Sequence, residues 1–206
     1  MSRAVSRKST TRDPRKLIGI VTLVVIIVGL IVVVGWFSRP NTVVPESATK
    51  AIGSSKLKVG DTAPEFNVQT NAGPFDLASV QTPVLLEVFA TWCPHCQRET
   101  TVLNDIATKY QGKIAMVAVS GSAQDSTGSG AETQPDVNTF GATYQVRYPL
   151  AFDPDLKVAS LYLKTGFPTL VLIGANKKIV WMRDGEVPEA ALDKAIAGAI
   201  SASPTT

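Results

Sequence analysis

The chain has 206 residues, of which 45% are hydrophobic, and it carries a formal net charge of +3 at pH 7. Six of its 20 basic residues lie in residues 1–16 with a single acid, so the remainder holds 14 basic and 16 acidic residues and is near neutral, at −2. This balance gives no reason to expect a nucleic-acid-binding surface.

An uncharged segment at residues 17–38 follows this basic tail and ends in Trp36 and Phe37. About 20 apolar residues are enough for a helix to cross the hydrocarbon core of a bilayer, and aromatic residues are enriched at the membrane interface. We therefore expect a transmembrane anchor at residues 17–38. The positive-inside rule then places the tail, residues 1–16, in the cytoplasm and everything after the anchor outside it.

A cleaved signal peptide is the alternative to an anchor. Its apolar region is shorter, about 7–15 residues, and ends at a cleavage site between small residues, which residues 35–39 resemble poorly. Residues 39–56 are rich in Pro, Ser, Thr and Ala without periodicity, which predicts a flexible linker. Residues 57–202 then form one domain, large enough to bury a core without structural disulfides.

The domain is predicted to begin with a hairpin at residues 67–77, in which Asn, Ala, Gly and Pro form the turn. Residues 84–90 are an apolar run with a single acid, Glu87, and predict a buried strand. Residues 96–110 carry apolar side chains at helical spacing, and residues 114–120 predict a second buried strand.

The second half of the domain continues the alternation of helices and strands. Residues 121–134 are rich in Gly, Ser and Thr and predict a mobile loop. Short helices are predicted at residues 135–146 and 156–163, a hairpin at residues 169–182 and a closing amphipathic helix at residues 188–200. Together these elements predict an α/β domain with a mixed sheet.

Residues 91–96 read Thr-Trp-Cys-Pro-His-Cys and hold the only two cysteines and the only histidine of the chain. They connect a predicted strand to a predicted helix, so we expect Cys93 at the helix N-terminus and partly exposed. Free N–H groups and the helix dipole favour a thiolate there, and Pro94 suits the first helical turn. Such a dithiol predicts disulfide exchange, with Cys93 as the nucleophile and Cys96 as the resolving thiol.

Two other interpretations of the cysteine pair remain open. A structural zinc site usually needs four ligands, more than two cysteines and His95 supply, so we expect no metal. A structural disulfide would close a loop too short to constrain the unfolded chain much. We therefore expect no cofactor beyond a redox-active disulfide between Cys93 and Cys96, which an exported location would permit to form.

The chain resembles the thioredoxin fold in its order of elements and in three motifs. These are Trp-Cys-x-x-Cys, Gly-Phe-Pro-Thr at residues 166–169 and Val-Gly-Asp-Thr-Ala-Pro-Glu-Phe at residues 59–66. The motif at residues 59–66 resembles the start of the TlpA/ResA branch of the thioredoxins, whose members are membrane-anchored and exported. The resemblance covers residues 57–202 and implies a thioredoxin-like fold, a central mixed sheet flanked by helices, preceded by one N-terminal transmembrane helix. The dipeptide Pro94-His95 resembles that of DsbA-type oxidases, although residues 121–148 are too few for the helical insertion of DsbA.

The resemblance also implies roles for two acids. Family members often bury an acid at the position of Glu87, near the inner cysteine. Burial would raise its pKa and let it exchange a proton with Cys96, unless the side chain reaches solvent at a strand edge. ResA-like proteins carry a glutamate at the position of Glu99, for which a solvated helix-surface charge is the alternative.

Three further positions are implied to bind the partner or to tune the dithiol. Phe167 and Pro168 resemble the cis-proline loop, whose main chain pairs with an extended partner segment; an ordinary trans proline is the alternative. Trp92 resembles the aromatic residue beside the dithiol, unless it belongs to the core. His95 is expected near the Cys93 sulfur, where it would stabilise the thiolate and make the disulfide more oxidising, unless it points to solvent.

The sequence thus predicts a membrane-anchored thiol–disulfide oxidoreductase outside the cytoplasm. It would oxidise or isomerise disulfides in exported cysteine-containing proteins and exchange electrons with a membrane redox partner. The alternative is reduction, for example of apocytochrome c cysteines before haem attachment. A copper-handling protein on this fold would need a distant histidine, and a peroxidase would place Thr or Ser where Ala90 stands, so both are less favoured.

Overall fold

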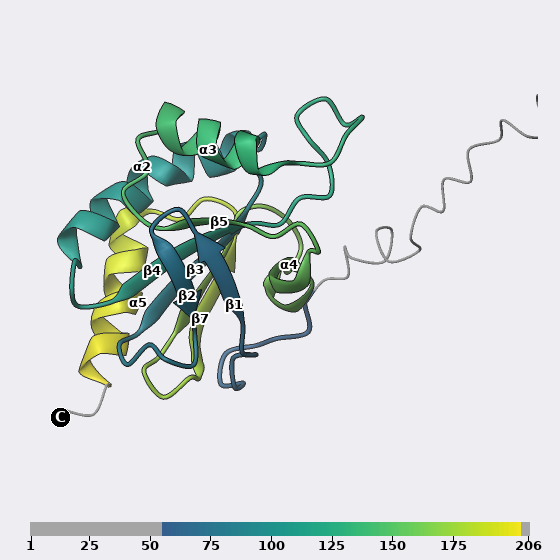
Figure 1. Cartoon of the computed structure of the whole chain (residues 1–206). Coiled ribbons are helices and arrows are strands. Elements are labelled where there is room, and N and C mark those ends of the chain that lie inside the picture. The colour runs from purple at the N-terminus through teal and green to yellow at the C-terminus, as the bar shows by residue number, and fades with distance from the viewer. Residues whose placement is uncertain (1–54, 203–206) are drawn as a thin grey trace, which may run out of the picture. The chain divides into compact units, whose positions relative to one another are not determined.

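The computed structural model describes residues 55–202 (Figure 1). The basic tail, the anchor expected at residues 17–38 and the linker up to residue 54 lie outside this range. Within residues 55–202, no helix has both the length and the apolar character that crossing a membrane requires.

Seven strands form one sheet in the order β2-β1-β5-β4-β3-β6-β7. The strands are β1 (Asn67–Thr70), β2 (Gly73–Asp76), β3 (Val84–Phe89), β4 (Ala115–Ser120), β5 (Leu150–Phe152), β6 (Thr169–Ile173) and β7 (Ile179–Asp184). The β3-β4 and β4-β5 pairs are parallel, whereas the other neighbours are antiparallel. The sheet is therefore mixed, as predicted, and the wholly buried strand β3 lies between β4 and β6.

Helices cover both faces of this sheet. They are α2 (Pro94–Lys109), α3 (Gln134–Thr143), α4 (Lys157–Tyr162) and α5 (Glu189–Ser201). Apolar side chains of α2, α3 and α5 pack into one buried cluster with the sheet, while those of α4 pack into a second cluster. Figure 1 shows α2 and α5 on one side of the strands and α4 on the other.

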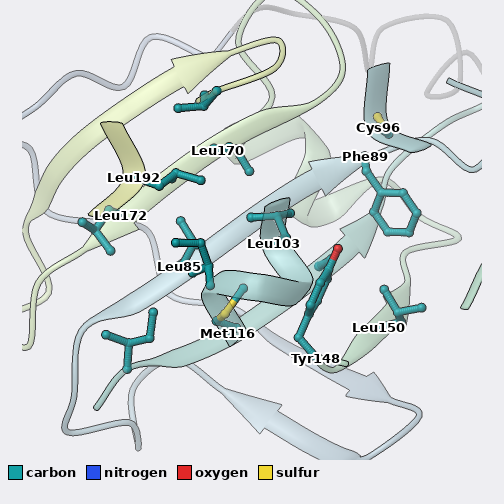
Figure 2. Close-up of a cluster of buried hydrophobic side chains, with 14 of the residues drawn as sticks. Leu85, Phe89, Cys96, Leu103, Met116, Tyr148, Leu150, Leu170, Leu172 and Leu192 are labelled. Carbon is teal, nitrogen blue, oxygen red and sulfur yellow. The ribbon is translucent and has the colours of Figure 1, made fainter. Parts of the chain in front are cut away.

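The alternation of side chains along β3 places its acid beneath the first helix. Leu85 and Phe89 belong to the cluster under α2, α3 and α5, whereas Leu86 and Val88 belong to the cluster under α4. Successive side chains of a strand point to opposite faces, so Glu87 points to the same face as Leu85 and Phe89. Figure 2 shows Phe89 in this cluster together with Cys96.

One strand of the sheet was not predicted from the sequence. The three-residue strand β5 (Leu150–Phe152) lies between β1 and β4, and three residues are too few for a periodicity to show. Helix α2 begins at Pro94 with Cys93 as its N-cap, which confirms the predicted place of Pro94 in the first helical turn. The two predicted hairpins, the second buried strand and the closing helix are present.

Candidate active site

The two cysteines lie at the N-terminus of α2 as free thiols. Cys93 is the N-cap residue and Pro94 occupies the first helical turn. Cys96 is one turn further and has no exposed surface, whereas Cys93 is 5% exposed. The expectation that Cys93 is partly exposed is therefore wrong. Its Sγ instead donates a hydrogen bond of 3.6 Å to the carbonyl oxygen of Phe167, which covers it.

The loop that covers Cys93 contains a cis peptide bond between Phe167 and Pro168. The Phe167 ring packs edge-on against Trp92, with 6.2 Å between the ring centroids. Trp92 is 37% exposed, so it flanks the dithiol at the surface rather than lying in the core. The Cys93 thiol thus contacts the main-chain carbonyl of Phe167, whose ring packs against Trp92.

Glu87 is buried in the centre of the sheet, with 3% of its surface exposed. The Tyr148 hydroxyl donates a hydrogen bond of 3.4 Å to its Oε2, and its Oε1 has no hydrogen-bond partner within residues 55–202. Burial, and next the charge of Glu99, raise the pKa of Glu87 to about 8. Burial, and next the charge of Glu87, raise the pKa of Cys96 well above its ordinary range. The structure therefore brings an acid with a high pKa together with the inner cysteine.

Glu99 is a second buried acid beneath the dithiol, with 1% of its surface exposed. Its Oε2 accepts a hydrogen bond of 2.9 Å from the Val187 N–H, and its Oε1 has no partner among the described residues. Burial raises the pKa of Glu99 to about 7, against the opposing effect of the Val187 hydrogen bond. The alternative of a solvated helix-surface charge does not hold for this residue.

His95 is exposed and forms a hydrogen-bonded cluster with Arg98 and Glu186, two residues for which the sequence carries no functional signal. Its Nδ1 lies 2.6 Å from Oε1 of Glu186 and 2.9 Å from a guanidinium nitrogen of Arg98. Arg98 also donates to Glu186, over 2.6 Å from Nη2 and 3.0 Å from Nε. The imidazole thus pairs with a carboxylate, and the effect of His95 on the Cys93 thiolate stays a prediction. Hydrogen bonds from Arg98 and then His95 lower the pKa of Glu186 to about 2.

Three consecutive residues between β7 and α5 connect the parts of this site. The Gly185 N–H donates to the Pro168 carbonyl oxygen over 2.8 Å, Glu186 binds the exposed face of α2, and the Val187 N–H donates to Glu99. The sequence carries no signal for the contacts of Glu186 and Val187 with α2, because these paired residues lie 91 and 88 positions apart along the chain.

A second connection fixes the residues that precede Cys93. Glu132 is 2% exposed and accepts hydrogen bonds from the Thr91 N–H over 2.7 Å, from the Thr91 hydroxyl over 2.5 Å and from the Ser120 hydroxyl. Trp92 Nε1 donates to the Ser122 hydroxyl over 2.9 Å and to the Gln124 carbonyl over 2.7 Å. The loop after β4 is thus fastened to the dithiol motif, a contact that its small polar residues did not predict.

The arrangement joins a reactive thiol at a helix N-terminus, a buried second thiol, a proton-accepting acid and a main-chain carbonyl that an extended chain could approach. Among residues 55–202, no three His, Cys, Asp or Glu side chains form a group that could hold a metal ion. The chemistry open to these groups is the exchange of a dithiol with an external disulfide.

The AhpC/TSA family matches residues 59–182 of the chain. The thiol–disulfide oxidoreductase ResA of Bacillus cereus is 28% identical over 134 residues, which cover 64% of this chain and 72% of the relative. The crystal structure of a Chlorobium tepidum protein assigned as thiol:disulfide interchange protein DsbE is 29% identical with a TM-score of 0.61, covering 70% of this chain and 99% of that one. A solution structure from Bacteroides thetaiotaomicron, assigned as a protein disulfide isomerase, is 25% identical with a TM-score of 0.63 and covers 72% and 93%.

Proposed function

We propose that this chain, which belongs to the AhpC/TSA family and within it to the ResA/TlpA-like thiol–disulfide oxidoreductases, reduces disulfides in exported proteins from the outer side of the cytoplasmic membrane. Dithiol exchange is the activity that the family and the fold give it. The direction of electron flow, the anchor and the class of partner are the proposed parts.

The reaction begins when the Cys93 thiolate attacks one sulfur of a partner disulfide. A mixed disulfide forms, and the second partner sulfur leaves as a thiolate that takes up a proton. Cys96 then loses its proton to the Glu87 carboxylate and attacks the Cys93 sulfur, which releases the first partner sulfur. Two electrons pass from the dithiol to the partner, and Cys93 and Cys96 end as a disulfide.

The burial of Cys96 against an acid is the observation that carries the proposed direction. Burial and the neighbouring Glu87 raise the pKa of this thiol, so the reduced protein gains little from ionising it. Stabilisation of a thiolate is what makes a dithiol protein such as DsbA a strong oxidant. The sequence favours oxidation or isomerisation through His95, but the pairing of His95 with Glu186 weakens that argument, because the carboxylate reduces the electrostatic effect of the imidazole on a thiolate.

The location is proposed from the sequence. The uncharged segment at residues 17–38 behind a basic tail supports an uncleaved anchor with the domain outside the cytoplasm. The partners are then exported cysteine-containing proteins. Each turnover leaves the dithiol oxidised, so a membrane dithiol protein must return two electrons to it.

The reduction potential of the full-length protein tests the direction. Equilibration with thiol–disulfide buffers of known potential, followed by alkylation of free thiols, gives the reduced fraction at each point. We expect a value near that of thioredoxin, about −270 mV, whereas a value near that of DsbA, about −120 mV, would overturn the proposal. A reporter fused after Thr206 tests the location, because it should work only if its activity requires export.

A further inference from the structure

A cavity of about 290 Å³ opens between the dithiol motif and α3. Its walls include Trp92 and Gln97 beside the cysteines, and Asp136, Phe140 and Tyr144 on the α3 side. We propose that this cavity is a subsite that binds the cationic side chain of a lysine or arginine in the partner polypeptide, close to the cysteine under attack. The proposal deepens the exchange reaction at Cys93 by naming a feature of the partner, and it rests on that reaction.

Two residues that line the cavity are close to Cys93 in the sequence. Trp92 immediately precedes Cys93, and Gln97 lies four residues after it, in the first turns of α2. During exchange the partner is covalently joined to Cys93, so its residues next to the cysteine lie close to Trp92 and the first turn of α2. A side chain from one of them can therefore enter the cavity.

The wall on the cysteine side is held in place by hydrogen bonds. Glu132 binds the N–H and the hydroxyl of Thr91, and the Gln97 side-chain amide donates to the Thr91 carbonyl over 3.1 Å. Trp92 is held through its indole N–H by Ser122 and the Gln124 carbonyl. A partner therefore meets a subsite that is already formed, which reduces the entropy lost on binding.

The charge of the cavity selects a cation. Asp136 is the one charged residue among the described residues that line it. One carboxylate oxygen accepts hydrogen bonds from the N–H and the hydroxyl of Thr133, over 2.8 and 2.7 Å, and the other has no hydrogen-bond partner within residues 55–202. The segment from residue 115 to residue 146 contains three acids and no lysine or arginine, so no neighbouring base in it competes for this oxygen.

Aromatic side chains supply the rest of the fit. Trp92, Phe140 and Tyr144 line the cavity, and the rings of Phe140 and Tyr144 lie 4.8 Å apart. Lysine and arginine bury their apolar stems along such surfaces, and their charged ends are attracted to aromatic faces. A glutamate or aspartate side chain would instead be repelled by Asp136.

Single-cysteine peptides, each joined to glutathione by a disulfide, test the subsite with the reduced full-length protein. One position at a time, within three residues on either side of the cysteine, carries either lysine or norleucine in an alanine and glycine background. We expect lysine to raise the second-order rate constant about fivefold over norleucine at one position. Asp136→Asn should abolish this ratio, because the amide keeps an oxygen for Thr133 but carries no charge.

Two further variants make the result specific. Thr139→Lys adds an ammonium group at an exposed lining position without changing the helix cap, and it should also abolish the lysine preference. Asp105→Asn removes the same charge from an exposed position of α2 that does not line the cavity, and it should keep the preference. Equal rates for lysine and norleucine at every position, or a preference that survives in both lining variants, would overturn the subsite. Failure of every peptide to react would instead refute disulfide exchange at Cys93.

Discussion

The Glu186 carboxylate lies 2.6 Å from Nδ1 of His95, and the same carboxylate accepts hydrogen bonds from Arg98. One acid thus pairs with both His95 and Arg98 at the start of the helix that carries the dithiol. The electrostatic effect of His95 and Arg98 on a Cys93 thiolate is reduced by this pairing.

Replacing Glu186 with glutamine should therefore make the disulfide more oxidising. Without the carboxylate, the positive charge of Arg98 and the N–H groups of His95 act on the Cys93 thiolate and stabilise the reduced protein. We expect the equilibrium constant with glutathione to shift about threefold toward the reduced protein. Glu189→Gln removes an acid that contacts Lys109 instead and should leave the equilibrium unchanged. An equal shift in both variants would remove Glu186 from this role.

The two cysteines should differ sharply in their capture of partners. Cys96→Ala leaves Cys93 able to attack a disulfide but removes the thiol that resolves the mixed disulfide, so adducts should accumulate. Cys93→Ala leaves only a thiol with no exposed surface, which should capture few partners. Non-reducing electrophoresis after alkylation gives the amount of adduct for each variant, and equal capture by both would reverse the assigned roles.

The resolving step should depend on the ionisation of Glu87. Its pKa is raised to about 8, so the fraction of carboxylate able to accept the Cys96 proton grows as the pH approaches 8. In the wild type, release of the first partner sulfur should accelerate over this range, as stopped-flow measurement of the mixed disulfide would show. Glu87→Gln should be slow at every pH. Glu99→Gln should move the profile to lower pH, because the charge of Glu99 contributes to the raised pKa of Glu87.

The same burial makes the stability of the reduced protein depend on pH. The pKa of Glu87 rises from about 4.5 when exposed to about 8 in the fold, so the folded state binds the extra proton between these values. The contribution of Glu87 to the free energy of unfolding is therefore fully present below about pH 4.5 and is lost as the pH rises toward 8. The loss is on the order of 3 kcal/mol at pH 7. Glu99 acts with the same sign, since its pKa is about 7. Denaturant unfolding at several pH values should show this loss, and Glu87→Gln should flatten it.

Glu132 should contribute strongly to stability although it lies outside the dithiol motif. Glu132→Ala leaves the Thr91 N–H and two hydroxyl groups without their acceptor, which costs about 2–3 kcal/mol of unfolding free energy. Glu132→Gln keeps one acceptor oxygen and should lose less. Urea unfolding gives the difference, and Trp92 fluorescence should report whether the neighbouring loop has shifted. Unfolding curves that coincide for wild type and Glu132→Ala would contradict this account.

The elements that the sequence predicts well are those set by local patterns. The apolar run at residues 84–90 and the alternation of side chains along it determine both the buried strand and the inward direction of Glu87. The N-cap position of Cys93 follows from its place between this strand and a proline-started helix. Each of these features depends only on residues that are close to it in the sequence.

The features that the sequence did not reveal depend on distant contacts. The exposure of Cys93 is decided by the carbonyl of Phe167, which lies 74 residues away. The environment of His95 is decided by Glu186, 91 residues away. The hydroxyl that contacts Glu87 comes from Tyr148, which precedes a strand too short to be recognised. A single sequence gives no means of pairing such positions.

Only 5% of the Cys93 surface is exposed, and its sulfur contacts the carbonyl oxygen of Phe167 in the neighbouring loop. A disulfide held inside a compact folded protein cannot bring its sulfur through so narrow an opening, whereas a stretched, accessible segment can lie flat against the loop. The enzyme should thus distinguish unfolded partners from folded ones. On the proposed reducing function, we expect an unfolded chain to be a substrate and its disulfides to be protected once it has folded.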